Sequence, residues 1–304
     1  MIPKWLVRLV EQHGPRVLTR LGRSTSRWIS RHRLARRVAP LARSHRTRNA
    51  GLPADQLRLR NGAIVRVTPD ARETYEYFCF RDPDVVAEFD AFDHLTRRSS
   101  RLLDIGAEHG FFSIAFTSGR DRARRAIAIE PSRRSHAILV DQIGRNNALV
   151  TPLEVAAGDT PGTIDVATHG AHHVTAFSAY DDLGRDRVRI AVRTVDDICR
   201  EHAFDPDVMK VDVEGYETHV LKGARETLSR CRPLILLEIH PELIRALGHS
   251  VVDILSMLAD HGYTSVRPRC RLEALSRYLA PGGSTRVALR HRSNAASSDR
   301  LSSR

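Results

Sequence analysis

Long apolar runs are missing from this 304-residue chain, and clustered cysteines are missing too. No stretch approaches the roughly 18 uninterrupted apolar residues that a membrane-spanning helix needs, and the N-terminus lacks the apolar segment of a signal peptide. The four cysteines lie far apart without a Cys-x-x-Cys pair, which argues against a disulfide framework and against a cysteine zinc site. We therefore expect a cytoplasmic protein with reduced thiols.

Lysine is also scarce: the chain has three lysines, so its formal net charge of +12 comes almost entirely from arginine. Residues 1–50 carry thirteen Lys or Arg side chains against the single acid Glu11, and this segment alone accounts for +12. Residues 51–285 sum to −4, so the body of the protein is not basic. Apolar residues recur at roughly helical spacing in residues 1–50. They predict either a solvated, partly disordered extension or a basic amphipathic helix that binds an anionic membrane surface or RNA.

Short apolar runs alternate with amphipathic stretches from about residue 51 onward. Strands alternating with helices at this spacing predict an α/β fold with a mostly parallel sheet covered by helices on both faces. The expected strands are 101–105, 125–130, 150–157, 208–213 and 233–239, with further β segments at 162–166, 188–192, 264–266 and 285–289. The expected helices begin at 111 and cover 131–147, 217–229 and 251–261.

The segment from Asp104 to Gly110 follows a predicted strand and opens a helix. Glycines at such a turn let a ligand approach the backbone, and the helix start offers free N–H groups. A dinucleotide fingerprint would have glycine where this chain has Asp104, so a pyrophosphate would meet a carboxylate, which disfavours NAD. An acid there, with Gly106 and Gly110 after it, suits a positively charged cofactor such as S-adenosylmethionine.

Glu130 ends the next predicted strand, and a carboxylate at this place can accept hydrogen bonds from both ribose hydroxyls of a nucleoside. A structural alternative stays open, in which Asp104 caps the helix and Glu130 is an ordinary acid at a strand end. Loop and acid together predict the binding site of a nucleoside cofactor.

A third group of charges follows the predicted strand 208–213. Alternation along a strand puts Lys210, Asp212 and Glu214 on one side, and the strand end at Asp212 should neighbour the strand end at Asp104. Such a cluster can deprotonate a hydroxyl or hold a metal ion, or it can form an ion network that satisfies only itself.

The next strand ends in Glu238 and His240. Histidine titrates near neutral pH, so His240 is a candidate base, although a structural histidine fits the pattern equally well. The histidines of segment 168–173 invite a metal interpretation, but no carboxylate or cysteine is fixed near them in sequence.

These motifs together resemble the FkbM family of S-adenosylmethionine-dependent methyltransferases. The matching segments are LDIGAEHGFFS (103–113), AIEPS (128–132), VAAGD (155–159), RTVDDI (193–198), VMKVDVEGYETHVLKGARETL (208–228) and PLILLEIHP (233–241). One departure is Glu108, where the family loop usually carries Asn. Residues 1–50 have no counterpart in the resemblance.

The resemblance implies a seven-stranded class I methyltransferase sheet and methylation of a hydroxyl on a sugar, glycolipid or natural product. Carried over to this chain, it implies that Asp104, Gly106 and Gly110 line the methionine end of the cofactor. Ala107 and Glu108 of the same loop are also expected to bind the cofactor. Glu130 would bind the ribose, and Asp159 would lie near the adenine. With this family in view, we expect four segments: an extension (1–50), lead-in helices and strands (51–100), the methyltransferase domain (101–290) and a disordered tail (291–304).

Methyl transfer to a hydroxyl requires alignment of two reactants and removal of one proton. The candidate bases are Asp212 or Glu214, then His240, with Glu238 and Lys210 completing the site. A divalent metal held by Asp212, Glu214 and Glu238 fits this chemistry, but nothing in the sequence requires one.

Two other functions stay open. One is an RNA methyltransferase that holds nucleic acid through residues 1–50, although residues 51–285 lack a basic stripe leading to the site. The other is a non-catalytic binding module at the inner membrane surface. The acceptor's identity and the oligomeric state are not encoded in short motifs.

Overall fold

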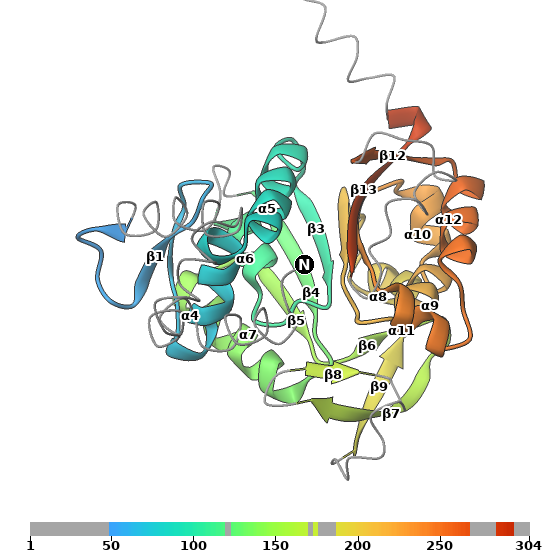
Figure 1. The fold of residues 1–304 in the computed structure, drawn as a ribbon, viewed down its shortest axis with the longest axis horizontal. Coiled ribbons are helices and arrows are strands. Elements are labelled where there is room, and N and C mark those ends of the chain that lie inside the picture. Colours follow the sequence, from blue (N-terminus) through green and yellow to red (C-terminus); the bar gives the residue numbers. More distant parts are fainter. Residues whose placement is uncertain (1–48, 119–122, 170–172, 176–186, 268–283, 295–304) are drawn as a thin grey trace, which may run out of the picture.

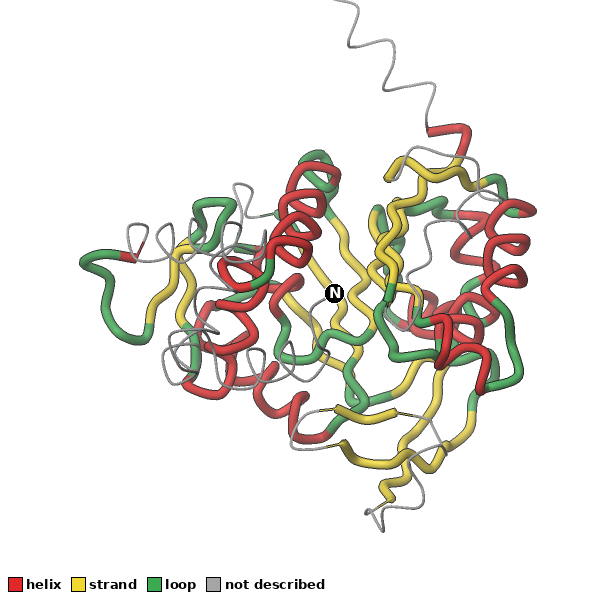
Figure 2. Tube along the Cα trace, in the orientation of Figure 1, coloured by secondary structure: helices red, strands yellow, loops and turns green. Residues whose placement is uncertain are grey.

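The structure is a computed structural model that describes residues 49–118, 123–169, 173–175, 187–267 and 284–294. A central sheet runs through the molecule, with helices on both faces, as Figure 1 shows. A second, smaller sheet lies beyond the carboxyl ends of the central strands (Figure 2). The α/β architecture predicted from the alternation of strands and helices is confirmed.

The central sheet has seven strands in the order β12-β13-β11-β10-β3-β4-β5. Strands β11, β10, β3, β4 and β5 pair in parallel, whereas β13 is antiparallel to both of its neighbours. This is the mostly parallel seven-stranded sheet of class I methyltransferases that the resemblance implied. Its strands are β3 (Arg101–Ile105), β4 (Arg125–Ile129), β5 (Val150–Leu153), β10 (Val208–Val211), β11 (Leu234–Ile239), β12 (Tyr263–Arg267) and β13 (Thr285–His291).

Alternating side chains of these strands enter two separate cores. On strand β3, Leu102 packs with the helices on one face, while Leu103 and Ile105 pack with those on the other. Because both faces are covered, the strands read as apolar runs rather than as alternating patterns. The first face carries α4 (Pro69–Glu76), α5 (Pro83–Leu95), α6 (Phe111–Thr117) and α7 (Arg133–Asn146), and the second carries α8 (Val195–Glu201), α9 (Glu217–Lys222), α10 (Arg225–Arg230), α11 (Pro241–Ala246) and α12 (Val251–Asp260).

The single helix expected over 217–229 is wrong, because the segment forms two helices that separate at Gly223. A side chain at Gly223 would lie 2.0 Å from the carbonyl oxygen of Gly158. The backbone of this turn therefore packs directly on the loop that begins at Gly158, and the helix ends where that contact is made.

The strand expected over 150–157 is also two strands. Its first part, β5, closes the central sheet, whereas β6 (Ala156–Ala157) pairs with β9 (Arg187–Arg193) in the second sheet. The second sheet has the order β6-β9-β7-β8 and is completed by β7 (Gly162–His169) and β8 (His173–Thr175). It places β6 and β7 next to the carboxyl ends of β3 and β4, so it can form one wall of a site there.

The segment before the central sheet forms a short hairpin of β1 (Gln56–Arg58) and β2 (Ile64–Arg66), followed by α4, a π-helical turn (Tyr77–Arg81) and α5. Aromatic rings from this segment and from α6 pack edge to face or stacked, as the 4.7 Å between the Phe78 and Phe111 centroids shows. The segment thus covers one face of the sheet next to the loop that follows β3.

Residues 1–48, on which the extension and its membrane or RNA contacts were predicted, lie outside the described residues, as do 295–304. Among the described residues, no helix combines the length and the apolar character required to cross a membrane.

Candidate active site

The turn after β3 is shaped by Gly106. Its φ of +81° is a left-handed conformation that favours glycine, and a Cβ atom there would lie 1.7 Å from the carbonyl oxygen of Asp212. The loops after β3 and β10 therefore touch backbone to backbone, and the predicted neighbourhood of the two strand ends is confirmed. No other residue could stand at this position without moving one of the two loops.

Asp104 lies behind this turn rather than on the pocket wall. It is 1% exposed, and its Oδ2 atom accepts hydrogen bonds from the backbone N–H and the hydroxyl of Ser113 in the first turn of α6. Burial raises the pKa of Asp104 against the opposing effects of Lys210 and Ser113. Its other oxygen, Oδ1, is buried without a hydrogen-bond partner. Its visible contacts are those of a helix cap that also stabilises the loop. Gly110, with φ +76°, is the N-cap residue of the same helix.

Glu130 follows β4 and is 6% exposed. Its Oε1 accepts the backbone N–H of Ser132 at 2.7 Å, and its Oε2 accepts that of Glu108 at 2.8 Å. Burial raises the pKa of Glu130 to about 7 in spite of these two hydrogen bonds. The carboxylate is therefore held in one orientation by backbone groups, and each oxygen keeps a second lone pair for a ligand.

A pocket opens between these strand ends. Gly106, Ala107, Glu108 and Glu130 line one side, and Lys210, Asp212 and Glu214 line another. Its apolar lining consists of Phe78, Ile105, Phe111, Phe112, Ile129, Pro131, Ala156, Ala157, Ile164, Val213 and Tyr216. It is thus an apolar slot with carboxylates at its edges, and the second sheet contributes to its wall.

Glu108, the departure from the family loop, has a left-handed φ of +48°. Asn adopts this conformation more readily than Glu does. The Glu108 side chain is 30% exposed and lies on the pocket wall, with Oε1 3.4 Å from the hydroxyl of Thr74 on α4. The replacement adds one carboxylate to a pocket that already contains several.

Asp159 does not line this pocket. Its Oδ1 atom lies 3.1 Å from Nδ1 of His219 on α9. Burial acts to raise the pKa of Asp159, but His219 outweighs it and holds the pKa below its usual value. Asp159 therefore belongs to a group behind Tyr216, one layer away from the pocket.

Lys210, which is buried, and Asp212, whose side chain is 24% exposed, form an ion pair at the end of β10, with 3.1 Å between Nζ and Oδ2. The ammonium also lies 4.7 Å above the ring centre of Phe112. Burial opposes the charge of Lys210, yet the carboxylates around it raise its pKa, and the same pairing lowers the pKa of Asp212. Both side chains are charged, so the Asp212 carboxylate is a weak base.

His240 lies at the end of β11 and is oriented by a residue that the sequence analysis did not select. Its Nδ1 atom is 2.6 Å from Oε1 of Glu217, a carboxylate with no exposed surface at the start of α9. Its Nε2 atom lies 3.6 Å from Oε2 of Glu214. Burial opposes the charge on His240, but the carboxylates of Glu217 and Glu214 raise its pKa to about 9. Glu217 stands in the most specific block of the sequence, two residues after Gly215, which was the signal available.

Glu238 faces the same cluster from within β11. Its Oε1 atom lies 3.8 Å from Nε2 of His240 and 2.9 Å from Nη2 of Arg286 on β13, and Ser284 donates to it. Burial and the charge of Asp212 raise the pKa of Glu238 to about 7. Arg286 also pairs with Glu88 of α5, with 2.5 Å between Nε and Oε2. Arg286 and Glu88 were missed because they come from distant parts of the sequence.

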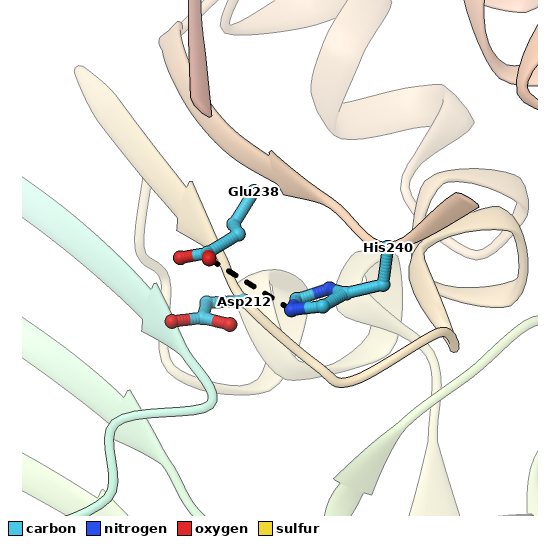
Figure 3. Close-up of side chains that lie close together, drawn as sticks. All are labelled: Asp212, Glu238 and His240. Atoms are coloured by element: carbon cyan, nitrogen blue, oxygen red, sulfur yellow. Dashed lines mark ion pairs between the residues drawn. The ribbon is translucent and has the colours of Figure 1, made fainter. Parts of the chain in front are cut away.

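Asp212, Glu238 and His240 converge from two neighbouring strands, as Figure 3 shows. Each offers one atom that could bind a metal ion, and these atoms lie within 4.8 Å of one another. Two of the three already have a cation beside them, Lys210 at Asp212 and Arg286 at Glu238. The cluster is thus largely neutralised by the protein's own side chains. Histidines 169 and 173 lie on the second sheet, and the 170–172 stretch between them is outside the described residues.

The chain matches the model of a known protein family. The model of the "Methyltransferase FkbM domain" family matches residues 104–265, which is more than half of the chain. A search of curated protein sequences with this chain finds no match.

Solved structures give similarities of the same kind. The methyltransferase FkbM from Methylobacillus flagellatus is 24% identical, with a TM-score of 0.37 over 53% of this chain and 37% of that one. This chain thus spans little more than a third of that protein's length. An O-methyltransferase described as putative, from Klebsiella pneumoniae, is 14% identical, with a TM-score of 0.37 over 82% and 87% of the two chains. TYW2 of M. jannaschii in complex with AdoMet is 12% identical, with a TM-score of 0.36 over 77% and 83%.

Proposed function

This chain belongs to the FkbM methyltransferase family, and we propose that it transfers a methyl group from S-adenosylmethionine to a hydroxyl oxygen of a small-molecule or carbohydrate acceptor. The observation that carries the proposal is the pairing of two half-sites at one edge of the sheet. Glu130 and the Gly106 turn would form the nucleoside site, and beside the loop after β10 the end of β11 carries a histidine held by a buried carboxylate.

The residues of the pocket fit this cofactor. Glu130 presents a carboxylate that backbone N–H groups hold in place, and it would accept hydrogen bonds from the ribose hydroxyls. Gly106 presents only backbone to the pocket, and Ile129 and Ile164 supply apolar walls. Glu108, on the same wall, would face the positively charged methionine end. Asp104 would act from behind, by holding the start of α6.

The proposed base is His240. When bound, S-adenosylmethionine supplies the methyl group on a sulfonium, whose positive charge disfavours the imidazolium form of a nearby histidine. Glu217 holds Nδ1 of His240 and so leaves Nε2 to take the proton of the acceptor hydroxyl. Glu217 also stabilises the imidazolium that results. Glu214, with a 44% exposed side chain near Nε2, would pass that proton to solvent.

Lys210, Asp212 and Glu238 would position the acceptor rather than take its proton. Asp212 is paired with Lys210 and its pKa is lowered, which makes it a poorer base than His240. Glu238, with a pKa of about 7, can either donate a hydrogen bond to the hydroxyl of the methylated compound or accept one from it. The mechanism needs no metal ion, because Lys210 and Arg286 already neutralise two of the carboxylates.

The first experiment is calorimetric titration of the full-length protein with S-adenosylmethionine, S-adenosylhomocysteine and NAD. We expect both adenosyl ligands to bind and NAD not to bind. Incubation with radiolabelled S-adenosylmethionine and a panel of hydroxyl acceptors, with and without EDTA, then tests turnover. Binding of NAD alone would overturn the cofactor assignment. Loss of turnover with EDTA that magnesium restores and zinc does not would overturn the metal-free mechanism.

The partners follow from the same proposal. The acceptor is a hydroxyl compound, and residues 1–50 would bring the protein to an anionic membrane surface on the cytoplasmic side. A methylated RNA acceptor, bound with a steep salt dependence that deletion of residues 1–50 abolishes, would instead support an RNA methyltransferase. Vesicle binding without turnover on any acceptor would support a binding module.

A further inference from the structure

Two histidines face each other outside the pocket. His219 comes from α9, and His249 comes from the segment between α11 and α12. Their Nε2 atoms lie 3.1 Å apart, and the rings meet edge to face at 75° with 4.8 Å between centroids. Both side chains are partly exposed.

The separation of the two nitrogens fits joint binding of one metal ion. Imidazole nitrogen binds zinc at about 2.0–2.1 Å. Two such nitrogens on one ion lie about 2.9 Å apart when the nitrogen–metal–nitrogen angle is 90° and about 3.4 Å apart when this angle is tetrahedral. The 3.1 Å observed between the Nε2 atoms falls inside this interval. The rings could therefore bind an ion with little movement.

Carboxylates lie beside the two rings. Asp159 Oδ1 lies 3.1 Å from Nδ1 of His219, which is the outer carboxylate that most metal-binding histidines have. The Nε2 atom of His219 faces His249 instead. Two carboxylates, Asp159 and Asp253, and one ammonium, Lys222, act on His249. The charge around the two rings therefore favours a cation.

We propose that His219 and His249 form a binding site for one divalent transition-metal ion of the zinc, nickel or copper class, with water completing its coordination. Imidazole ligands favour these ions over magnesium and calcium. The site is separate from the cluster of Asp212, Glu238 and His240. It is not remote from the cofactor, because the His219 ring stacks on Tyr216 at 4.2 Å between centroids and Tyr216 lines the pocket. A bound ion would stiffen that wall.

The test is zinc binding by the full-length protein, measured by competition with a zinc-chelating dye. We expect the wild type to bind one equivalent that is lost in His249→Ala and in His219→Ala. Asp159→Asn should weaken the same equivalent by about 10–100-fold, the usual effect of removing an outer carboxylate. Zinc binding that is unchanged in His249→Ala would overturn the proposal.

A matched control removes the other histidine group of the chain. The triple variant His169→Ala, His172→Ala, His173→Ala should keep the equivalent, and loss of zinc there instead of in His249→Ala would also overturn the proposal. Cobalt provides a second readout, because thiolate ligands give a charge-transfer band that imidazole ligands do not. Absence of that band, with d–d bands that disappear in His249→Ala, is the expected result. None of these measurements depends on cofactor binding or methyl transfer.

Discussion

The two halves of the pocket are built by different means. The cofactor half, which consists of Gly106, Glu108 and Glu130, depends on backbone: a left-handed glycine, a turn, and a carboxylate held by two N–H groups. The acceptor half is formed by Lys210 and Asp212 on the pocket wall and by Glu217, Glu238 and His240 next to that wall. It depends on contacts among charged side chains from β10, α9 and β11. A site made from backbone depends on local sequence, whereas a site made from a charge network depends on strands being brought together.

The largest effect should come from His240→Gln, which removes the proposed base. We expect kcat to fall by about 10²–10⁴-fold, the usual contribution of a general base, while the cofactor dissociation constant stays within about twofold. Methyl transfer to the acceptor found in the screen and calorimetry measure the two quantities. His261→Gln, whose Nδ1 lies 2.8 Å from the Met257 carbonyl, is the matched control and should keep both. Weakened cofactor binding in His240→Gln would mean that the two halves are not separate.

The next effect concerns the cofactor half. Glu130→Gln should raise the dissociation constant for S-adenosylmethionine by about 10–100-fold, because hydrogen bonds to a charged group contribute about 1.5–3 kcal/mol. In the wild type, affinity should also fall as the pH drops below about 7, where Glu130 becomes protonated and loses acceptor capacity. Calorimetry across this pH range checks both. Glu154→Gln, at a half-exposed carboxylate beside His136, is the control and should change neither.

A third variant acts on both halves at once. Gly106→Ala places a methyl group against the Asp212 carbonyl, and we expect the folded state to lose about 1–3 kcal/mol together with cofactor affinity. Gly248→Ala has a similar φ of +78° but nothing within 4 Å of the added Cβ. Thermal unfolding of the two variants separates backbone strain from overlap. Equal loss of stability in both would show that the contact with the β10 loop contributes nothing.

The smallest effect should be a shift in pH dependence. Because His240 must be neutral to accept a proton, wild-type kcat/KM should rise with pH up to about 9. Glu217→Gln removes the carboxylate that favours the imidazolium, so the inflection should move down by about one pH unit or more. Glu214→Gln, at 3.6 Å and more exposed, should move it less. A pH profile unchanged by Glu217→Gln would leave that residue with a structural role only.

The pKa of His240 also couples to stability. Its folded-state value is raised, so the stabilisation it contributes is fully present below the unfolded value of about 6.5 and is lost as the pH rises through about 9. Urea unfolding of the wild type between pH 6 and 10 should show this decline. The decline should be smaller in His240→Gln.

The cofactor half was open to prediction because each of its determinants stands at or near the end of an apolar run in its own short segment. Asp104, Gly106 and Glu130 follow two apolar runs directly, and their places at strand ends follow from the length of those runs. The capping contact of Asp104 with Ser113 could be weighed from sequence but not decided, since a carboxylate at a strand end can face a helix or a ligand.

The acceptor half was predictable only in part. Asp212 and His240 were selected as strand-end residues, but Glu217 became important only through its 2.6 Å approach to His240, 23 residues away. The ion pairs of Arg286 with Glu88 and Glu238 depend on an antiparallel strand entering the sheet beside β11. Such contacts depend on the register between paired strands. The hydrophobic periodicity of a single segment carries no information about that register.

Sequence alone determined the alternation of strands and helices, the glycine turn after β3 and the family to which the chain belongs, because each of these is written in short segments. Tertiary structure decided which carboxylates share the pocket, which one orients His240, and that His219 meets His249. These contacts depend on packing across the sheet. A shift of one residue in the register of a strand would bring a different side chain to the site.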